Sequence, residues 1–467
     1  MTIFKAYDIR GIYPRELNEE IAYKIARAFV LFLRKHNPAI VVGQDMRISS
    51  PKLAGAIIRG LLDQGAQIID IGLAATPTFY FEVAQNKHAG GIMVTASHNP
   101  KEYNGLKMVK ESAINLSISD MQWIQQQIAD ITITDESNMM GKTGKIDMTD
   151  TTNTGPIKKG KITQKHTSLA EQVQHDLTYL NKSIKQVKPF RIVADAANAM
   201  GALYLRELFR HLPCKLIEMN FELDGTFPAH PADPLADENL EGLKQKVKAE
   251  KANLGIATDG DGDRIFFVDD KGETVPQPIM RGLVAQAFLR EHPGEKICYD
   301  IRPGKITEEM IRAAGGIPIK TKVGHTNIKE TMRKENAPFA GEIAGHFFVR
   351  TAHGSYETPM IVILKLLEYM TMSSKPLSEL LKPYKKYWNS GEINFRLERK
   401  DAAADAIIEH FNDGKIDRMD GITIEYPDFW FNVRTSNTEP LLRLNLEAVN
   451  KTIGEKKVKE IKKIIEG

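Results

Sequence analysis

The stretch AIVVGQD, residues 39–45, shows the pattern that decides the fold, because it is an apolar run that ends in an acidic residue. A helical pattern from about Lys52 follows it, and then a second apolar run, AQIIDIG. The same order recurs in FRIVADA (190–196), with a helix from about Gly201 and then CKLIEMN, and in KICYDIR, with a helix from about Lys305 and then IPIKTKVG. Strands that alternate with helices of this length form mixed or parallel sheets with helices on both faces. The sequence therefore predicts three repeated α/β units.

The other parts of the 467-residue chain connect these units and follow them. A single core rarely grows to this size, so we expect three or four domains. The polar run from 141 to 166, rich in threonine and lysine, is predicted to connect the first two units. A second junction is predicted near TMSSKP (371–376), because the strands after it, such as FWFNVRT and LLRLNLEAV, differ in pattern. We expect a smaller α+β domain there, closed by the amphipathic helix KTIGEKKVKEIKKIIE, whose lysines form a solvated face.

The composition is that of an ordinary globular protein. Apolar residues make up 42% and charged residues 26%, and a net charge of +3 over this length gives no general attraction to nucleic acid or membranes, so we expect a small-molecule partner. The start, MTIFKAYDIRG, lacks a signal-peptide pattern, and charges interrupt the apolar segment IAYKIARAFVLFLRK. Cys214 and Cys298 lie in apolar runs and are expected to be buried thiols, which fits a reducing cytoplasm.

The segment LGIATDGDGDRIFFVDD carries the sharpest motif, in which Asp259, Asp261 and Asp263 alternate with glycines just after an apolar strand. Three carboxylates this close repel one another unless a cation holds them. Gly260 and Gly262 permit positive φ angles, so the side chains can converge on one point. Oxygen ligands with an open position suit Mg²⁺ shared with a phosphate. The alternatives are a solvated acidic turn and a calcium loop, but the glycine and glutamate that an EF-hand needs at its sixth and twelfth positions are absent.

A second candidate site lies in VTASHNPKEYNGLK, residues 94–107, where an apolar strand runs into a loop. No Gly-x-Ser-x-Gly elbow surrounds Ser97, so hydrolase-type acyl chemistry is poorly supported. Ser97 is either a turn former or the carrier of a phosphoryl group whose oxygens Mg²⁺ neutralises. His98 is able to hydrogen-bond a phosphate or a loop carbonyl. Lys107 is either an acid or base for a sugar hydroxyl, if its pKa is lowered, or a surface lysine.

The segment NVRTSNTEPLLR places Arg434, Ser436, Asn437 and Thr438 between two predicted strands. Arginine offers a bidentate fork to phosphate, and small polar side chains with loop amides supply further donors. The alternative is a polar hairpin turn closed by Pro440. The residue types suit phosphate binding, and the segment alone does not choose between the two interpretations.

Further polar residues lie at loop-like positions. Glu342 and His346 flank small residues in FAGEIAGHFF, an arrangement able to bind sugar hydroxyls. Arg10 in AYDIRG and His325 in KVGHTN are either functional or paired with a neighbouring carboxylate.

Taken in order, the segments TASHNP, DGDGDR, GEIAGH and RTSNTEP resemble the four active-site loops of the α-D-phosphohexomutase superfamily, in particular its phosphomannomutase/phosphoglucomutase branch. The resemblance spans the whole chain, since YDIRG, VGQDMRISSP, FPAHPADPLADENL and KVGHTN match as well. It implies an α/β fold of three repeated mixed α/β domains plus a C-terminal α+β domain around a central cleft. We expect domain I at 1–155 with the phosphoserine loop, domain II at 156–253, domain III at 254–370 with the metal and sugar loops, and domain IV at 371–467 with the phosphate-binding loop.

The resemblance also implies a role for each matching residue. It identifies a catalytic group made of Ser97, His98, Lys107, Arg264 and Arg10. It implies one Mg²⁺ per chain, held by the phosphorylated Ser97 together with Asp259, Asp261 and Asp263. Substrate binding is assigned to Glu342, His346 and His325, and to Arg434, Ser436, Asn437 and Thr438 around the non-reacting phosphate.

The implied activity is that of a cytoplasmic phosphohexomutase, an isomerase that interconverts hexose 6-phosphate and hexose 1-phosphate of mannose or glucose. Ser97 would carry the phosphoryl group, and a hexose 1,6-bisphosphate would be both intermediate and activator. We expect a monomer or small homo-oligomer. The alternatives are a phosphoglucosamine mutase, a non-catalytic sugar-phosphate-binding protein and a metal-dependent phosphatase. Two residues depart from the family pattern: Ala344 stands where this branch commonly has serine, which bears on the choice of sugar, and Arg302 stands where lysine is frequent, which keeps the charge but not the shape.

Overall fold

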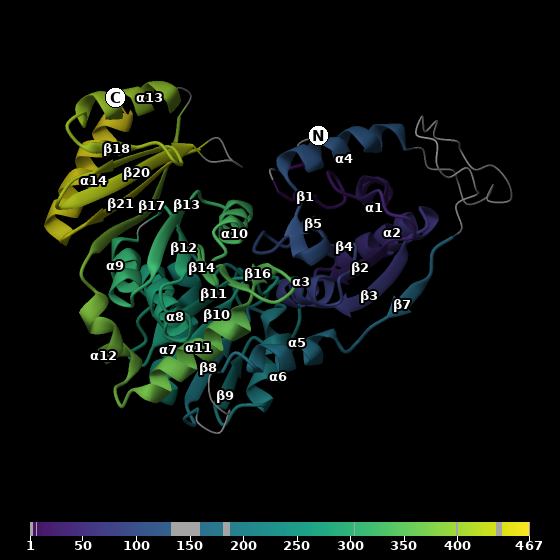
Figure 1. Ribbon diagram of the computed structural model, residues 1–467, viewed down its shortest axis with the longest axis horizontal. Helices are drawn as coiled ribbons and strands as arrows, with labels where there is room; N and C mark the ends of the chain where they lie inside the picture. Colours follow the sequence, from purple (N-terminus) through teal and green to yellow (C-terminus); the bar gives the residue numbers. More distant parts are fainter. Residues whose placement is uncertain are drawn as a thin grey trace. The chain divides into compact units, whose positions relative to one another are not determined.

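The computed structural model describes residues 3–5, 7–131, 159–180, 187–302, 304–397, 400–435 and 441–466 (Figure 1). The chain divides into two compact units. The first consists of Met1–Leu169 and Asp224–Pro228, and the second of Ala170–Leu223 and Ala229–Gly467. In the described ranges, no helix is both long and apolar enough to cross a membrane.

The first unit contains a mixed seven-stranded sheet in the order β1-β5-β4-β2-β3-β7, with β6 paired to β5. Strands β2, β3, β4 and β7 run parallel, while β1 and β5 pair antiparallel. The strands are β1 (Ile9–Ile12), β2 (Ala39–Gln44), β3 (Gln67–Leu73), β4 (Gly90–Val94), β5 (Tyr103–Lys110), β6 (Ile114–Asn115) and β7 (Ile162–Gln164). The helices are α1 (Glu19–Leu33), α2 (Ser50–Asp63), α3 (Thr76–Gln85) and α4 (Ile118–Asp130), with the short 3₁₀ helix η1 (Glu111–Ala113).

Local sequence explains where these helices begin. Asn18 caps α1 by accepting a hydrogen bond from the Ile21 amide at 3.0 Å, and Ser117 and Asp120 form a capping box at the start of α4. Helix α2 begins at Ser50, slightly before the predicted start, because Pro51 is tolerated in a first turn. The apolar faces of α1, α2 and α4 meet residues of β2 and β4 in one core.

Glu82 of α3 ties the segment that contains β7 to the first unit. Its buried carboxylate accepts hydrogen bonds from Lys165 at 2.9 Å and from Ser168 at 2.8 Å, and lies 3.0 Å from Nε2 of His88. Burial alone would raise the pKa of Glu82, but these partners outweigh it and lower the pKa to about 2. The boundary predicted between residues 155 and 156 lies outside the described residues, and so does the connection up to residue 158. Strand β7, which follows it, belongs to the first sheet.

The second unit begins with a four-stranded sheet in the order β11-β10-β8-β9. It is built from β8 (Arg191–Asp195), β9 (Lys215–Met219), β10 (Leu254–Thr258) and β11 (Ile265–Asp269), with α5 (Ser168–Leu177), α6 (Gly201–Arg210), η4 (Asp237–Leu240) and α7 (Glu241–Glu250). The boundary predicted between residues 253 and 254 falls inside this sheet, because β10 pairs in parallel with β8. The metal loop therefore leaves the second sheet and not the third.

The third sheet has the order β13-β12-β14-β15-β16. Its strands are β12 (Lys296–Asp300), β13 (Ile317–Thr321), β14 (Phe339–Gly341), β15 (Phe347–Arg350) and β16 (Ser355–Glu357). The helices are α8 (Gln277–Glu291), α9 (Lys305–Ala313), α10 (His325–Lys334) and α11 (Pro359–Met372). The boundary predicted between residues 370 and 371 falls in the last turn of α11.

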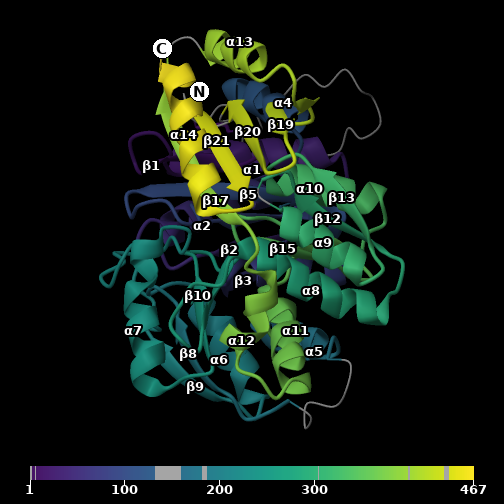
Figure 2. The same ribbon diagram turned by 90° about the vertical axis from the view of Figure 1, so that its left-hand side faces the viewer.

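The C-terminal sheet is antiparallel throughout, in the order β17-β21-β20-β19-β18, and α14 lies along it (Figure 2). Its elements are β17 (Trp388–Arg396), β18 (Lys415–Asp417), β19 (Ile422–Glu425), β20 (Phe429–Thr435), β21 (Leu441–Ala448), α13 (Lys400–His410) and α14 (Lys451–Glu466), preceded by α12 (Leu377–Leu381) and η5 (Lys382–Tyr384). Three repeated α/β sheets and one α+β sheet confirm the predicted fold class.

The aspartates at the ends of the first two repeated strands have a structural role. The Asp45 carboxylate accepts the Arg47 amide at 3.0 Å, and the Asp195 carboxylate accepts the Ala197 amide at 2.9 Å. Each closes the turn that leads from strand to helix, as aspartate does in Asx turns.

The expectation that both cysteines are buried holds for Cys298 alone, since Cys214 is half-buried. Cys214 directly precedes β9, which is an edge strand of its sheet. Burial raises the pKa of the Cys298 thiol to about 12 and that of Cys214 to about 11, so both stay protonated at neutral pH.

Candidate active site

Ser97 lies in a turn just after β4 and is 2% exposed. Its φ of 52° is in the left-handed region, which is uncommon for a residue with a side chain. The Ser97 amide donates to Oγ1 of Thr95 at 3.0 Å, and its Oγ lies 3.2 Å from Nδ1 of His98. The turn therefore holds the hydroxyl beside an imidazole, at the end of a buried parallel strand.

Arg10 and Lys107 are on the strands beside this turn. Arg10 of β1 donates to the Ala96 carbonyl at 3.4 Å and to the side chain of Asn99, and its Nε pairs with Asp8 at 2.8 Å. Lys107 of β5 is 5% exposed and stands opposite a residue of β4 in the sheet. The structure thus assembles four predicted catalytic residues, Arg10, Ser97, His98 and Lys107, within the first unit.

The three aspartates of the metal loop converge in the turn between β10 and β11. One carboxylate oxygen from each of Asp259, Asp261 and Asp263 lies within 4.8 Å of the others, and all three side chains are buried. The turn is shaped by its backbone, because the Gly262 amide donates to the Asp259 carbonyl at 3.2 Å. Gly262 has a φ of 74°, and a Cβ there would lie 2.9 Å from the ring of Tyr204. Three convergent carboxylates in a buried loop form a donor set of the kind that binds Mg²⁺.

The sugar loop lies between β14 and β15 and contacts the metal loop. Glu342 and His346 are joined by a 2.9 Å hydrogen bond from Nδ1 of the ring, and Nε2 of His346 lies 3.2 Å from Asp263. The backbones of Arg264 and His346 form an antiparallel bridge, and Nε of Arg264 is 3.3 Å from the His346 ring. Gly345 makes this approach possible, since its φ is 90° and a Cβ would lie 2.4 Å from Phe266.

The charges of the two loops compensate one another. Burial alone would lower the pKa of His346, but Asp263 and Glu342 outweigh it and raise the pKa to about 9. Burial would raise the pKa of Glu342, and His346 and Arg302 instead hold it far below its usual range. The pair is therefore a buried imidazolium and carboxylate at neutral pH. His325, at the start of α10, has its ring centroid 6.2 Å from that of His346 and its Nδ1 3.7 Å from Glu357.

Arg434 lies on β20 with 4% of its surface exposed, and its Nη2 donates to Glu392 of β17 at 2.9 Å. Burial, and after it the nearby positive charge of Arg302, lowers the pKa of Arg434, while Glu392 opposes that shift. The other predicted members of this loop, Ser436, Asn437 and Thr438, lie outside the described residues. The described part thus provides one buried guanidinium at the end of an antiparallel strand.

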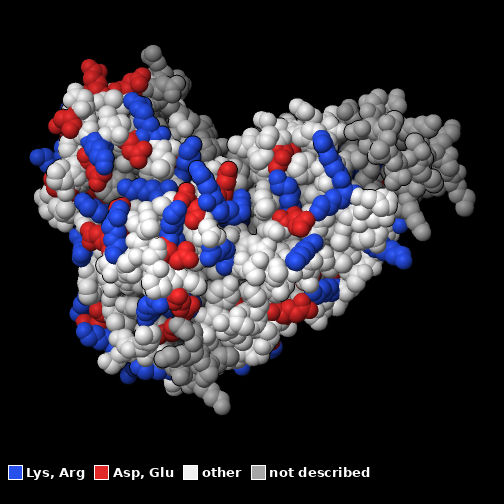
Figure 3. Space-filling view, viewed as in Figure 1, with Lys and Arg blue, Asp and Glu red and all other residues white. Residues whose placement is uncertain are grey.

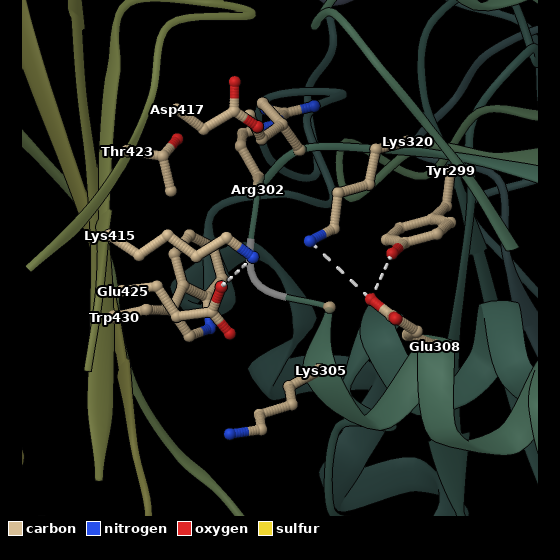
Figure 4. A pocket seen from close by; sticks show the side chains of 12 residues that line it. Tyr299, Arg302, Lys305, Glu308, Lys320, Lys415, Asp417, Thr423, Glu425 and Trp430 are labelled. Carbon is tan, nitrogen blue, oxygen red and sulfur yellow. Dashed lines mark hydrogen bonds and ion pairs between the residues drawn. The ribbon is translucent and has the colours of Figure 1, made fainter. Parts of the chain in front are cut away.

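A pocket lies between β12 and α9 on one side and β18–β20 on the other (Figure 4). Lys320 and Lys415 point into it from opposite sides, and each has a glutamate partner, Glu308 at 3.6 Å and Glu425 at 3.9 Å. Its remaining lining residues are Tyr299, Ile301, Arg302, Gly304, Lys305, Asp417, Thr423 and Trp430. Arg302 also pairs with Glu342 at 3.2 Å, so the pocket borders the sugar loop.

Lysine, arginine and acidic side chains are interspersed over the face in Figure 3. The visible face shows no broad patch of one sign, in keeping with the net charge of +3. This distribution suits a protein whose charged chemistry is concentrated in buried sites.

Family models match four successive parts of the chain. The phosphoglucomutase/phosphomannomutase alpha/beta/alpha domain I matches residues 1–135, domain II residues 169–272, domain III residues 279–387 and the C-terminal domain residues 392–464. The chain belongs to the phosphoglucomutase/phosphomannomutase family. It is therefore a phosphohexomutase, an isomerase that moves a phosphoryl group on a hexose.

Relatives named as hexose-phosphate mutases match this chain over almost their whole length. The chain is 37% identical over 481 residues to a phosphomannomutase of Methanocaldococcus jannaschii, covering 100% of this chain and 98% of the relative. It is 38% identical over 471 residues to a Xanthomonas campestris protein named phosphohexose mutases, covering 99% of each. A crystal structure of a phosphoglucomutase/phosphomannomutase family protein from Burkholderia thailandensis superposes with a TM-score of 0.86 at 29% identity, covering 99% of this chain and 97% of that one.

Some side chains of this phosphohexomutase site were given no role by the sequence. Asp300 and Arg302 are buried, and Nε of Arg302 donates to Asp300 at 2.5 Å. Both lie at the end of a predicted strand. Because each repeated strand carries an acidic residue at that position, the repeat pattern could have indicated them. Glu392 had no such signal, because it is a single acidic residue in a partly exposed strand. Arg47 contacts the Ser97 turn from the segment VGQDMRISSP, which the sequence linked to the family without giving its arginine a role.

Proposed function

We propose that this phosphohexomutase interconverts the 1- and 6-phosphates of mannose and glucose through a phosphoserine at Ser97 and a hexose 1,6-bisphosphate intermediate. The observation that carries the proposal is the buried convergence of Asp259, Asp261 and Asp263 within 4.8 Å in a chain that matches the family over all four domains. Mg²⁺ held by these carboxylates and by phosphorylated Ser97 would neutralise the oxygens of the phosphoryl group. Arg264 supplies a further positive charge beside Asp259, at 3.9 Å.

In the proposed reaction the bond between phosphorus and Ser97 Oγ breaks as a sugar hydroxyl oxygen bonds to phosphorus. The hydroxyl proton must leave the sugar, and a proton must reach Ser97 Oγ. Lys107 is proposed as the group that takes the first, because it is a buried lysine on the strand beside the loop. The 3.2 Å separation of Ser97 Oγ from Nδ1 of His98 supports a role for His98 in supplying the second. In the second step the transfer runs in reverse: Ser97 Oγ bonds to the phosphorus at the other end of the bisphosphate as the bond to that sugar oxygen breaks, the oxygen takes up a proton, and the isomer and phosphoserine result.

We propose that Glu342, His346 and His325 bind the sugar hydroxyls and that Arg434, with Ser436, Asn437 and Thr438, binds the phosphate that does not react. The ion pair between Glu342 and His346 supports the first assignment, because it places a carboxylate and an imidazole, two groups that can bind hydroxyls, on one short loop. The phosphate site has to accept either end of the sugar, which a guanidinium fork with small polar neighbours can do. Ala344 removes one hydroxyl contact relative to the serine common in this branch, so both mannose and glucose phosphates are proposed as substrates.

Coupled assays on mannose 1-phosphate and glucose 1-phosphate, with a hexose 1,6-bisphosphate as activator, test the proposal. We expect turnover that requires Mg²⁺, and Ser97→Ala is expected to lower it by about three orders of magnitude or more, because no other oxygen replaces the carrier. Ser374→Ala, which changes an exposed serine, serves as the control and should keep full activity. Intact mass after treatment with the bisphosphate should show one added phosphoryl group in the wild type and none in Ser97→Ala.

The same assays separate the alternatives. A phosphatase would release inorganic phosphate in place of isomer, and a phosphoglucosamine mutase would prefer glucosamine phosphate. A non-catalytic binding protein would show heat of binding without turnover. Isomer formed at an unchanged rate by Ser97→Ala would refute the assignment of the carrier.

A further inference from the structure

A buried guanidinium lies directly against the turn that carries Ser97. Arg47 follows β2 and is 1% exposed, and its Nε pairs with Asp45 at 3.2 Å. Its guanidinium donates hydrogen bonds to main-chain carbonyls of the turn after β4 and of the first residue of β5. Nη1 donates to Pro100 at 2.8 Å and Tyr103 at 3.0 Å, and Nη2 to Ser97 at 2.8 Å and Asn99 at 2.6 Å.

These bonds act on a residue with an uncommon backbone conformation. Ser97 has a left-handed φ of 52°, and such a conformation persists only where the surroundings hold it. Its amide is fixed by Thr95 and its carbonyl by Arg47, so both peptide groups that flank the side chain are held. The direction of the Ser97 Oγ is consequently set by the position of the Arg47 guanidinium.

Only arginine can make this set of contacts. Its planar fork presents five N–H donors in fixed directions, whereas a lysine ammonium is a single point with three donors. Asp45 neutralises the charge and is itself held by the Arg47 amide at 3.0 Å and by Ser50 Oγ at 2.5 Å. We call the contacts between Arg47 and the main chain around Ser97 the Arg47 clamp. It is therefore built on the turn that follows β2.

A segment from far along the chain covers the clamp. The ring of Phe227 lies 5.1 Å from the Arg47 guanidinium carbon, within range of a cation–π contact. A Cβ on the buried Gly225 would lie 2.7 Å from Cα of Arg47 and from the carbonyl oxygen of Met46, so the backbones touch. By its contacts, the segment Asp224–Pro228 belongs to the first unit although the chain around it belongs to the second.

We propose that Arg47 is a positioning residue for phosphoryl transfer, which holds the carrier oxygen of Ser97 in its reactive direction, and that Phe227 closes this clamp. The inference rests on the proposed function, because it assumes that Ser97 is the carrier. It assigns a role in catalysis to a residue that does not touch the substrate, and it predicts a loss in the transfer step without a matching loss in sugar-phosphate binding.

The test compares Arg47→Lys and Phe227→Leu with a matched control, Arg27→Met, which removes another partly buried arginine of the first unit that lies over a tyrosine ring. A misplacement of about 1 Å costs about 100-fold in rate, so we expect Arg47→Lys to lower kcat by about 100-fold with KM changed less than about threefold. Phe227→Leu should lower kcat by about tenfold. Added guanidinium should partly restore kcat in Arg47→Ala and not change the activity of Arg27→Met.

Amide hydrogen exchange of residues 95–103 provides a readout that does not depend on turnover. Arg47→Lys and Phe227→Leu should speed exchange there by at least about tenfold, with the core helices α1 and α2 unchanged, and Arg27→Met should not. If Arg47→Lys does not fold, Phe227→Leu decides the outcome by the same measurements. Unchanged exchange, or a kcat within about threefold of wild type in Arg47→Lys, overturns the inference. If residues 95–103 exchange more slowly in the wild type than in Arg47→Lys, but the wild type shows neither turnover nor phosphoserine, the proposed function is refuted instead.

Discussion

Replacing Asp261 with asparagine should affect stability in opposite directions with and without a divalent cation. Its carboxylate lies within 4.8 Å of those of Asp259 and Asp263, all buried. At an effective dielectric constant of about 20, one pair of charges 4.8 Å apart repels by about 3.5 kcal/mol, so the substitution removes about 7 kcal/mol of repulsion before neighbouring charges are counted. Arg264 pairs with Asp259 and His346 with Asp263, and both ion pairs remain in the variant.

These positively charged neighbours offset most of the repulsion in the metal-free protein. We therefore expect Asp261→Asn to stabilise the metal-free second unit by about 2 kcal/mol, which corresponds to about 3 °C in Tm for a unit of this size. With Mg²⁺ at about 1,000 times its Kd, the wild type gains about 4 kcal/mol by linkage, while the variant, lacking one ligand, gains less than about 1 kcal/mol. The order of stability should therefore reverse when the cation is added.

Thermal unfolding followed by calorimetry, in EDTA and in saturating Mg²⁺, measures this reversal. Asp405→Asn, an exposed change on α13, is the control and should show the wild-type response to Mg²⁺. A lower Tm for Asp261→Asn in EDTA would refute the repulsion argument. A full Mg²⁺ shift in the variant would refute the assignment of Asp261 as a ligand.

Buried charges elsewhere give two further predictions. The pKa of Glu82 is lowered from 4.5 to about 2 in the folded protein, so the carboxylate contributes about 3 kcal/mol of stability that is present above about pH 4.5 and is lost as pH falls towards 2. Denaturant unfolding should show that Glu82→Gln is less stable than the wild type at pH 6 and that this difference in stability narrows at lower pH. A difference that stays constant with pH would contradict the prediction. Lys329 and Glu357, both 1% exposed and 3.0 Å apart, form a buried ion pair. Lys329→Met should lower the free energy of unfolding by about 3–5 kcal/mol, and adding Glu357→Gln should recover more than half of that loss. Equal losses of stability in the single and the double variant would show that burial of a carboxylate without its lysine is not the cause.

Local sequence predicted much of the fold because its repeated signals are local. The strands β2, β8 and β12 are short apolar runs; β8 and β12 end in an aspartate, and Asp45 directly follows β2. The helices that follow begin within about two residues of the expected positions, and α2 carries a proline in its first turn.

Domain boundaries were harder to predict, because they depend on which strands pair. Residues Leu254–Thr258 have the pattern of an apolar strand whichever sheet they join, and only the parallel pairing with β8 assigns the metal loop to the second sheet. The segment Asp224–Pro228 carries no sign in its own sequence that it packs on Arg47. Long-range pairing of this kind is decided by tertiary packing, which local propensity does not encode.

Sequence by itself determined the chemistry available to this phosphohexomutase: a serine loop, three aspartates spaced by glycines, a glutamate and histidine four residues apart, and an arginine between two strands. Tertiary structure alone decided which buried groups support those residues. The Arg47 clamp, the bridge between Arg264 and His346, and the pairing of Arg434 with Glu392 each join segments well separated along the chain. The physical reason is that residue type fixes what a group can donate, accept or ionise, while the distance and dielectric between two groups exist only once the chain has packed.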